Sequence, residues 1–205
     1  MRIGILGGTF NPIHIGHLIM AESARETFGL SKILFIPCAI PPHKKASDLA
    51  APKLRLQMLE RALAGNPNFS ACDMEIVRGG KSYSYDTLKE LRAAHGPKDR
   101  FFFIIGADSL EQILSWHRIR ELMKLCRFIV VERPQDEAKP AREILRKMSR
   151  ADRRYFGEYI LNAFPIGVSS RQIRERLRRG LSVRYLVPEA VEVFLARTGL
   201  YQKGR

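Results

Sequence analysis

Cysteine is scarce in this sequence, and the spacing of the few cysteines excludes two kinds of small protein. The chain has three, Cys38, Cys72 and Cys126, and no two of them form a CxxC pair. An odd number at such wide spacing argues against a disulfide framework and against a zinc cluster. The sequence therefore favours a protein of the reducing cytoplasm.

Long apolar runs, internal repeats and low-complexity linkers are also lacking. No stretch is continuous enough to span a bilayer. The first apolar stretch, IGIL, is too short for a signal peptide and is followed at once by glycines and histidines. With 205 residues, 45% of them hydrophobic and 27% charged, the chain is expected to form a single domain over residues 1–205.

Acidic residues are too few to balance the basic ones. The chain has 35 Lys and Arg against 21 Asp and Glu, a net charge of +14, and residues 139–184 hold 13 of the basic residues against 4 acidic ones. A nucleic acid, a membrane surface and small phosphorylated substrates would all respond to this field. A solvated basic face that aids solubility explains the charge equally well. The net charge alone does not distinguish these partners from a solvated basic face.

The sequence does contain an alternation of strand and helix patterns. Continuous apolar runs, typical of buried strands, lie at residues 2–8, 32–38, 69–77, 100–106 and 127–134. Helical patterns lie at residues 15–28, 53–63, 86–94, 110–125 and 141–148, with two more helices in a C-terminal helical part of about residues 166–205. This order predicts an α/β fold, a Rossmann-like doubly wound parallel sheet, with ligands outside the carboxyl ends of its strands.

The stretch GGTFNPIHIGH follows the first predicted strand and leads into the first predicted helix. Gly7 and Gly8 would let the backbone approach a ligand or take a positive φ. His14 and His17 would lie on one face, near the positive end of the helix dipole. Backbone N–H groups, the dipole and two imidazoles suit a phosphate, whereas the Walker lysine and a GxGxxG motif are missing. The alternative is a pair of histidines that pack against a neighbouring strand.

A second segment, VSSRQIRERLRRG at residues 168–180, has the signals of a helix start and stop. Ser169 and Gln172 form a capping-box pattern, and Gly180 suits the position after the last turn. Ile173 and Leu177 would pack on the core while Arg174 faces a ligand. On its own, the segment is explained as well by a capped basic helix.

These two segments together resemble a known superfamily. Gly8–His17 is similar to the GxFxPxHxGH signature of the nucleotidyltransferase superfamily, and VSSRQIR is similar to its ISSTxIR motif, with Arg171 where Thr or Ser is usual. The resemblance implies that His14 and His17 bind the ATP phosphates and stabilise charge at the α-phosphate, with Arg174 as the third catalytic residue. The ATP-binding residues that it implies are Gly7, Gly8, Thr9, Phe10, His14, Gly16, His17, Gly106, Asp108, Ser169, Ser170 and Arg174.

Three further segments narrow the resemblance. PPHK at 41–44, SYSYDTL at 82–88, and GAD at 106–108 followed by Trp116 resemble the bacterial nicotinate-nucleotide adenylyltransferase family, from residue 2 to about 201. This implies adenylyl transfer from ATP to nicotinate mononucleotide in NAD biosynthesis. The nicotinate ring would lie against Trp116, and its carboxylate would bind main-chain amides of the SYSYDTL turn. The substrate-binding residues implied are His43, Lys44, Ser84, Tyr85, Trp116 and Arg133.

The residues taken alone leave alternatives open. His43 and Lys44 also suit a solvated loop, Trp116 suits simple packing, and Arg133 suits a surface position. A pantetheine-phosphate adenylyltransferase or a cytidylyltransferase would share the HxGH core, although PPHK, SYSYDTL and Trp116 argue against both. An RNA-binding protein would need exposed aromatic side chains beside its basic residues, whereas here the aromatics lie inside apolar runs.

The resemblance also sets expectations for cofactors and partners. Magnesium would be bound through the ATP phosphates and water, so no protein metal ligand is expected. The expected partners are ATP and nicotinate mononucleotide, with no membrane and no dedicated nucleic-acid partner. The sequence leaves the oligomeric state open, a homo-oligomer included.

Overall fold

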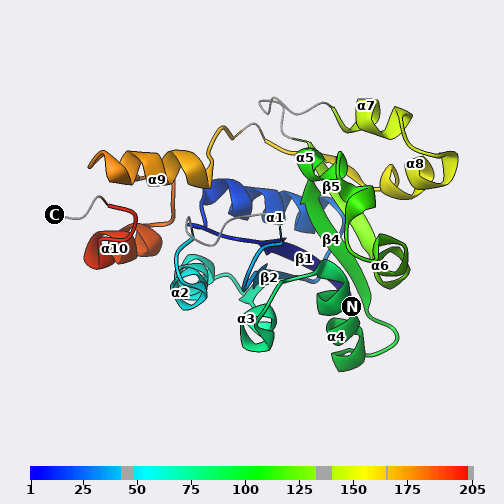
Figure 1. Cartoon of the computed structure of the whole chain (residues 1–205), viewed down its shortest axis with the longest axis horizontal. Helices are drawn as coiled ribbons and strands as arrows, with labels where there is room; N and C mark the ends of the chain where they lie inside the picture. The colour runs from blue at the N-terminus through cyan, green and yellow to red at the C-terminus, as the bar shows by residue number, and fades with distance from the viewer. Residues whose placement is uncertain (43–48, 133–139, 165, 203–205) are drawn as a thin grey trace.

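A parallel sheet of six strands forms the centre of the molecule (Figure 1). The computed structural model describes residues 1–42, 49–132, 140–164 and 166–202. The strands are β1 (Arg2–Gly8), β2 (Lys32–Pro37), β3 (Phe69–Ala71), β4 (Arg100–Gly106), β5 (Arg127–Glu132) and β6 (Ile160–Asn162). Their order is β3-β2-β1-β4-β5-β6, and every neighbouring pair is parallel. The predicted doubly wound α/β sheet is therefore confirmed, and its strand order reverses between β1 and β4.

Helices cover both faces of the sheet, which explains why its strands are apolar without alternation. One core cluster joins the sheet to α1 (Ile15–Thr27), α2 (Pro52–Leu63), α9 (Ser170–Arg178) and α10 (Glu189–Thr198). The other joins it to α4 (Ser84–Ala94), α5 (Ala107–Leu110), α6 (Ile119–Leu125), α7 (Ala141–Arg146) and α8 (Arg150–Phe156). Within β1, for example, Ile3 and Ile5 belong to the second cluster and Leu6 to the first.

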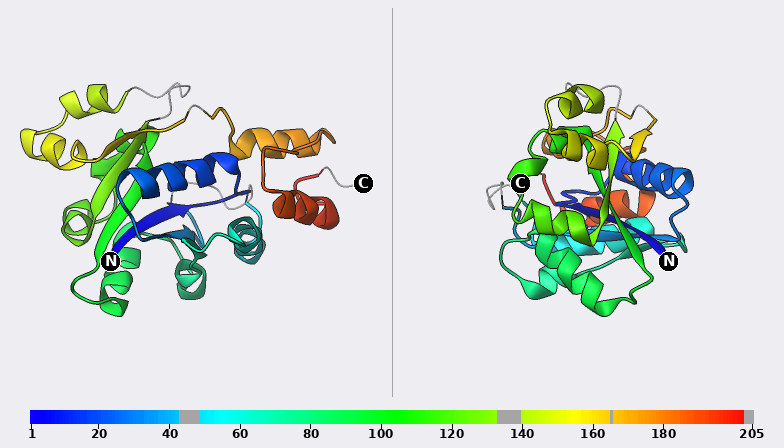
Figure 2. Two further views of the ribbon diagram at one scale, coloured as in Figure 1. Left: turned by 180° about the vertical axis from the view of Figure 1, so that it is seen from behind. Right: turned by 90° about the vertical axis from the view of Figure 1, so that its right-hand side faces the viewer.

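The two C-terminal helices, α9 and α10, lie together at one end of the molecule, and α7 and α8 lie at the other (Figures 1 and 2). Ile173 and Leu177 of α9 are buried, as predicted, in the same cluster as residues of α1 and α2. The C-terminal helices therefore extend the core on one face of the sheet. Among the described residues, no helix is long and apolar enough to cross a bilayer.

The third predicted strand, residues 69–77, is wrong over most of its length. The strand β3 ends at Ala71, and residues Met74–Arg78 form the short helix α3. β3 is an edge strand that pairs with β2 over only three residues, from Phe69 to Ala71. With so short a ladder, the apolar residues that follow are free to form a helical turn.

Two other differences concern short elements. The predicted helix over residues 110–125 is interrupted, because α5 ends at Leu110, a 3-10 helix spans Ile113–Ser115, and Arg118 has a left-handed φ of 53° before α6. The strand β6 and the helix α8 were not predicted. Both are short, and only Leu161 is buried in β6 and only Asp152 and Phe156 in α8, so neither has a strong apolar pattern.

Candidate active site

The turn that follows β1 brings the two predicted histidines together. His14 is the N-cap of α1 and is buried, and His17 lies in the first turn. Their ring centroids are 3.8 Å apart, with 33° between the ring planes. The backbone N–H of His14 donates to Nδ1 of His17 at 3.2 Å, so the neutral His17 ring carries its proton on Nε2. Phe10 packs edge-on against His17, with centroids 5.1 Å apart.

The glycines before this turn act through their small size. Neither Gly7 nor Gly8 has a positive φ; the left-handed residue of the turn is Phe10, with φ 46°. A Cβ on Gly7 would lie 3.3 Å from Cζ of Phe103, and one on Gly8 would lie 3.2 Å from Cζ of Phe10. Of the two expected possibilities, the positive φ is not the one that these glycines adopt, because the left-handed residue lies two positions after Gly8. Both glycines line a cavity, in agreement with the expected close approach to a ligand.

The second motif, at the start of α9, contacts the first. Ser169 caps α9, accepting from the N–H of Gln172 at 3.2 Å, and Gln172 Oε1 accepts from the N–H of Ser169 at 3.0 Å. The hydroxyl of Ser170 donates to the carbonyl of Pro12 at 2.8 Å. Nη1 of Arg174 donates to the carbonyl of Asn11 at 2.8 Å. These two bonds join the motifs directly, although the bonded residues lie 158 and 163 positions apart in sequence.

Arg174 keeps further binding capacity at this junction. Its Nε is buried and has no hydrogen-bond partner among the described residues. A buried guanidinium N–H without a partner is costly in the free protein and would be satisfied by an anionic oxygen.

Asn11, in the same turn, is held from two sides. Its Oδ1 accepts from the N–H of Ala50 at 3.0 Å and from the hydroxyl of Tyr201 at 2.5 Å. Burial raises the pKa of the Tyr201 phenol well above its usual range, so the hydroxyl remains a donor. Sequence reasoning missed both residues, which lie 190 positions apart.

A cavity of about 820 Å³ adjoins the turn at the carboxyl ends of β1, β2 and β4. Six of the predicted site residues line it: Gly7, Gly8, Thr9, Ser84, Asp108 and Trp116. Nine other predicted residues do not line the cavity: Phe10, His14, Gly16, His17, Tyr85, Gly106, Ser169, Ser170 and Arg174. The predicted residues His43, Lys44 and Arg133 lie outside the described residues.

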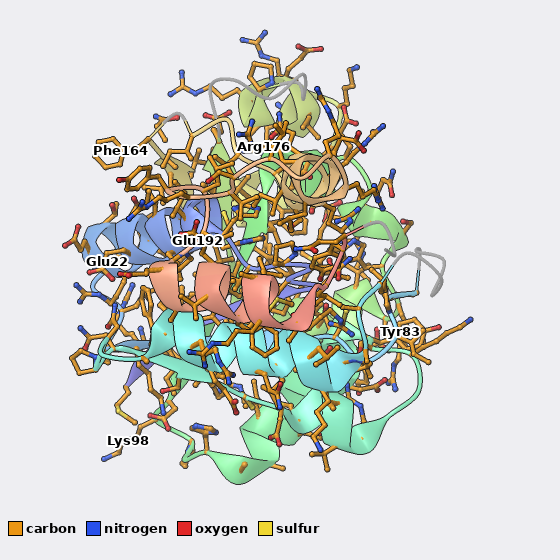
Figure 3. All side chains as sticks on the ribbon, turned by 90° about the vertical axis from the view of Figure 1, so that its left-hand side faces the viewer. Glu22, Tyr83, Lys98, Phe164, Arg176 and Glu192 are labelled. Atoms are coloured by element: carbon orange, nitrogen blue, oxygen red, sulfur yellow. The ribbon has the colours of Figure 1, made fainter. Side chains whose placement is uncertain are left out.

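Aromatic side chains form one wall of the cavity. The Trp116 ring packs edge-to-face on Phe103 and Phe128, with centroids 6.0 and 6.4 Å apart, and it also lines the cavity. Packing and ligand contact are therefore compatible for this residue. His117, which sequence reasoning missed, lines the same wall and stacks on Tyr83 at 4.5 Å. Figure 3 shows Tyr83 at the outer edge of the molecule, on the side away from Glu22.

A polar network supports the adjoining part of the wall, where α4 begins. The hydroxyl of Thr87 donates to Oε1 of the buried Glu75 at 2.5 Å, and Arg78 Nη2 donates to the Thr87 hydroxyl oxygen at 3.0 Å. Arg78 Nη1 also pairs with Glu90 at 2.8 Å. Since α4 begins at Ser84, which lines the cavity, the positive end of this helix lies at the wall. Tyr85 is held outside the cavity, with the Arg118 guanidinium 4.0 Å from its ring centroid.

Comparisons with known proteins agree with this geometry. The family model described as cytidylyltransferase-like matches residues 5–176. A probable nicotinate-nucleotide adenylyltransferase of Trichlorobacter lovleyi is 44% identical over 98% of this chain and 100% of that protein. One of Geobacillus kaustophilus is 42% identical over 98% of this chain and 86% of that protein. The chain belongs to the nicotinate-nucleotide adenylyltransferase family.

Solved structures share the fold of this family member. The nicotinic acid mononucleotide adenylyltransferase of Plasmodium falciparum, complexed with NaAD, matches with a TM-score of 0.78 at 22% identity, over 98% of this chain and 97% of that one. Its complex with APC matches with a TM-score of 0.75 at 20% identity, over 98% and 96% of the two chains. The resemblance drawn from the motifs is confirmed, and the chain is a nucleotidyltransferase.

Two other features bear on what this family member binds. Within the ranges that the structure describes, no three His, Cys, Asp or Glu side chains gather as a ligand set for a metal ion. The phenylalanines of β4 and β5 (Phe101, Phe102, Phe103 and Phe128) are buried. An RNA-binding sheet exposes such side chains, so these strands offer no aromatic platform for RNA.

Proposed function

We propose that this chain transfers the adenylyl group of ATP to nicotinate mononucleotide, releasing pyrophosphate and nicotinate adenine dinucleotide. The observation that carries the proposal is the junction of the two anion-binding motifs beside the cavity. Ser170 and Arg174 bond the carbonyls of Pro12 and Asn11, next to the stacked histidines. We propose that residues 1–205 act as one nucleotidyltransferase domain.

On the ATP side, His14, His17 and Arg174 are the proposed catalytic residues. The phosphate of the mononucleotide attacks the α-phosphorus while the bond to pyrophosphate breaks, so no protein nucleophile is needed. The protein aligns two mutually repelling phosphates and stabilises the charge that develops between them. The Nε2–H of His17 and the Nε–H of Arg174 are the donors that we assign to phosphate oxygens. Binding would also use Gly7, Gly8, Thr9, Phe10, Gly16, Gly106, Asp108, Ser169 and Ser170.

Magnesium enters with ATP in this proposal, bound by phosphate oxygens and water. When bound, it would supply positive charge beside the phosphate oxygens. Asp108 is exposed at the start of α5 and lines the cavity, and we assign it to the nucleotide hydroxyls or to the metal's water shell.

On the acceptor side, Trp116 and the start of α4 are proposed to hold the nicotinate. The ring would stack on the cavity face of Trp116, and the carboxylate would meet the first amides of α4 near Ser84 and Tyr85. His43, Lys44 and Arg133 are proposed to bind the mononucleotide phosphate.

Pyrophosphate release from MgATP tests the proposal directly. We expect release with nicotinate mononucleotide and much less with the nicotinamide form, because amide donors would face the NH₂ of nicotinamide. An unpaired buried donor costs about 1–3 kcal/mol, roughly 5- to 150-fold in selectivity. Pantetheine phosphate is the control acceptor for the related activity. Equal rates with all three acceptors, or none with either mononucleotide, would contradict the proposal.

A further inference from the structure

Arg55, in the helix α2, is fully buried and binds backbone carbonyls instead of a carboxylate. Its Nε donates to Ala50 O at 2.9 Å, Nη1 to Thr9 O at 2.8 Å, and Nη2 to Cys38 O at 2.7 Å and Ala39 O at 3.0 Å. Nη1 also approaches Cys38 Sγ at 3.9 Å. None of the ion pairs in the described part of the chain includes Arg55.

Burial of a cation without a counter-ion destabilises a protein more than burial of an apolar side chain. Desolvation of a charge is repaid only by excellent hydrogen bonding, and an apolar side chain of similar volume is often at least as stabilising. The contribution of Arg55 therefore comes from the backbone segments that its planar guanidinium binds. Only a guanidinium offers five N–H donors in a fixed plane, so only it can bind these three backbone segments at once.

Two of the segments that Arg55 holds follow the neighbouring strands β1 and β2, where Cys38 N–H donates to Gly8 O at 3.0 Å and Thr9 and Cys38 line the cavity. Thr9 follows β1, in the segment that leads to the histidines, and Cys38 and Ala39 follow β2. The N–H of Ala39 donates to Ser82 Oγ at 2.9 Å, and the N–H of Ser82 donates to Ile40 O at 2.9 Å. Ser82 stands just before α4, where the acceptor is proposed to bind. One chain of hydrogen bonds therefore connects the Thr9 segment, through Arg55 and the Cys38–Ala39 peptide, to the turn before α4.

Arg55 also fixes the direction of the peptide groups that it binds. A trans peptide is planar, so its C=O and N–H point in opposite directions. The Cys38–Ala39 peptide directs its C=O to Arg55 and its N–H to Ser82. By the same geometry, the bond from Arg55 to Thr9 O turns the N–H of Phe10 away from the guanidinium.

We propose that Arg55 is a positioning residue that sets the separation and orientation of the two halves of the site. It holds the Gly8–Thr9 segment of the ATP side against the Ser82–Ser84 turn of the acceptor side. This inference rests on the proposed function, in which two phosphates must meet in line. Reacting atoms must approach to about 3–3.5 Å, and a misplacement of about 1 Å costs roughly 100-fold in rate.

The substitution Arg55→Lys tests the inference because it keeps the charge and loses the fork. Arg92 of α4 supplies a matched control: its Nε and Nη2 donate to Leu125 O at 2.9 and 2.7 Å, and its Nη1 donates to Asp99 O at 2.6 Å. Those carbonyls precede β5 and β4, at the end of the sheet away from the cavity. Arg92→Lys therefore removes the same kind of carbonyl bonding without touching the site.

We expect Arg55→Lys to lower kcat about 10- to 100-fold, with KM for both substrates within about threefold of wild type. Arg92→Lys should keep kcat within about twofold, even where thermal melts show that the two variants lose similar stability. A wild-type kcat in folded Arg55→Lys, or an equal loss in the two variants, would overturn the positioning role. Inactive wild-type protein would instead overturn the proposed function.

Ser82→Ala tests the same connection from its other end and leaves α2 intact. We expect kcat to fall about 3- to 10-fold, and the double variant to lose less than the product of the two single losses, because both act through the Cys38–Ala39 peptide. If Arg55→Lys does not fold, the Ser82→Ala result decides. A kcat within about twofold of wild type in that variant would refute the connection.

Discussion

Replacement of Gly16 by alanine should lower activity without lowering stability. Gly16 lies in the first turn of α1, between the two histidines, and its φ is not positive. A Cβ built there would lie 3.1 Å from Nδ1 and 3.2 Å from Cε1 of His14, and 3.7 Å from the carbonyl of Val168. The His14 ring is buried and stacked on His17, so it can yield only by leaving that stack.

The size of the effect follows from these distances. An ordinary contact begins at 3.4 Å, so the His14 ring must move by a few tenths of an ångström. If a shift of about 1 Å costs roughly 100-fold, a shift of this size costs about 3- to 10-fold in kcat. Alanine in place of a helical glycine stabilises by about 0.4–1 kcal/mol, which offsets the strain. The melting temperature should therefore stay within about 3 °C of wild type.

The assay is pyrophosphate release at saturating MgATP and nicotinate mononucleotide, with a thermal melt of the same samples. Gly96→Ala is the matched control, because a Cβ at Gly96 meets nothing within 4 Å and its φ is not positive. The control should keep the wild-type kcat. A wild-type kcat in Gly16→Ala would refute the reasoning, and so would a kcat loss accompanied by a large drop in melting temperature.

Two other substitutions test the site and the fold. His17→Ala should cut kcat by about 10² or more while the protein stays folded, because a donor to the phosphates is lost. The control is His95→Ala, which removes a ring that packs on Phe101 and should keep kcat within about twofold. A wild-type kcat in His17→Ala would refute the assignment. Asp152→Asn should lower the melting temperature at pH 7: hydrogen bonds from Arg120, and then from Ser149, hold the pKa of Asp152 below its usual range. That stabilisation is present above about pH 4 and is lost as the pH falls through the lowered pKa, so melts from pH 7 to pH 2 should show the gap closing, and a constant gap would contradict the pairing.

The sheet and the two motifs that meet beside the cavity could be predicted because their causes are local in sequence. Strands buried on both faces must be apolar throughout, as in β4 and β5. The histidine turn and the start of α9 each carry their own signals, a Gly-Gly turn and a capping box. The packing of Ile173 and Leu177 then brings the two together.

The other features of the site and fold depend on contacts between residues that no local sequence pattern indicates. Arg55 shares a helix face with Met58 and Leu59, three and four residues further on, so the helical period indicates a buried position but not what an arginine would bind there. Its partners are backbone carbonyls, which every residue possesses. The bond between Tyr201 and Asn11 spans 190 positions. The break before α6 depends on one left-handed residue, Arg118, that is not a glycine.

The same preference for carbonyl partners bears on the excess positive charge. Many arginines of this chain donate to backbone oxygens, which add no negative charge to offset them: Arg2, Arg55, Arg61, Arg92, Arg153, Arg174 and Arg176. In residues 139–184, where basic residues most exceed acidic ones, Arg153 binds carbonyls of Leu145 and Arg146, and Arg176 binds that of Ser182. Part of the net charge of +14 therefore belongs to arginines that bind the protein's own backbone.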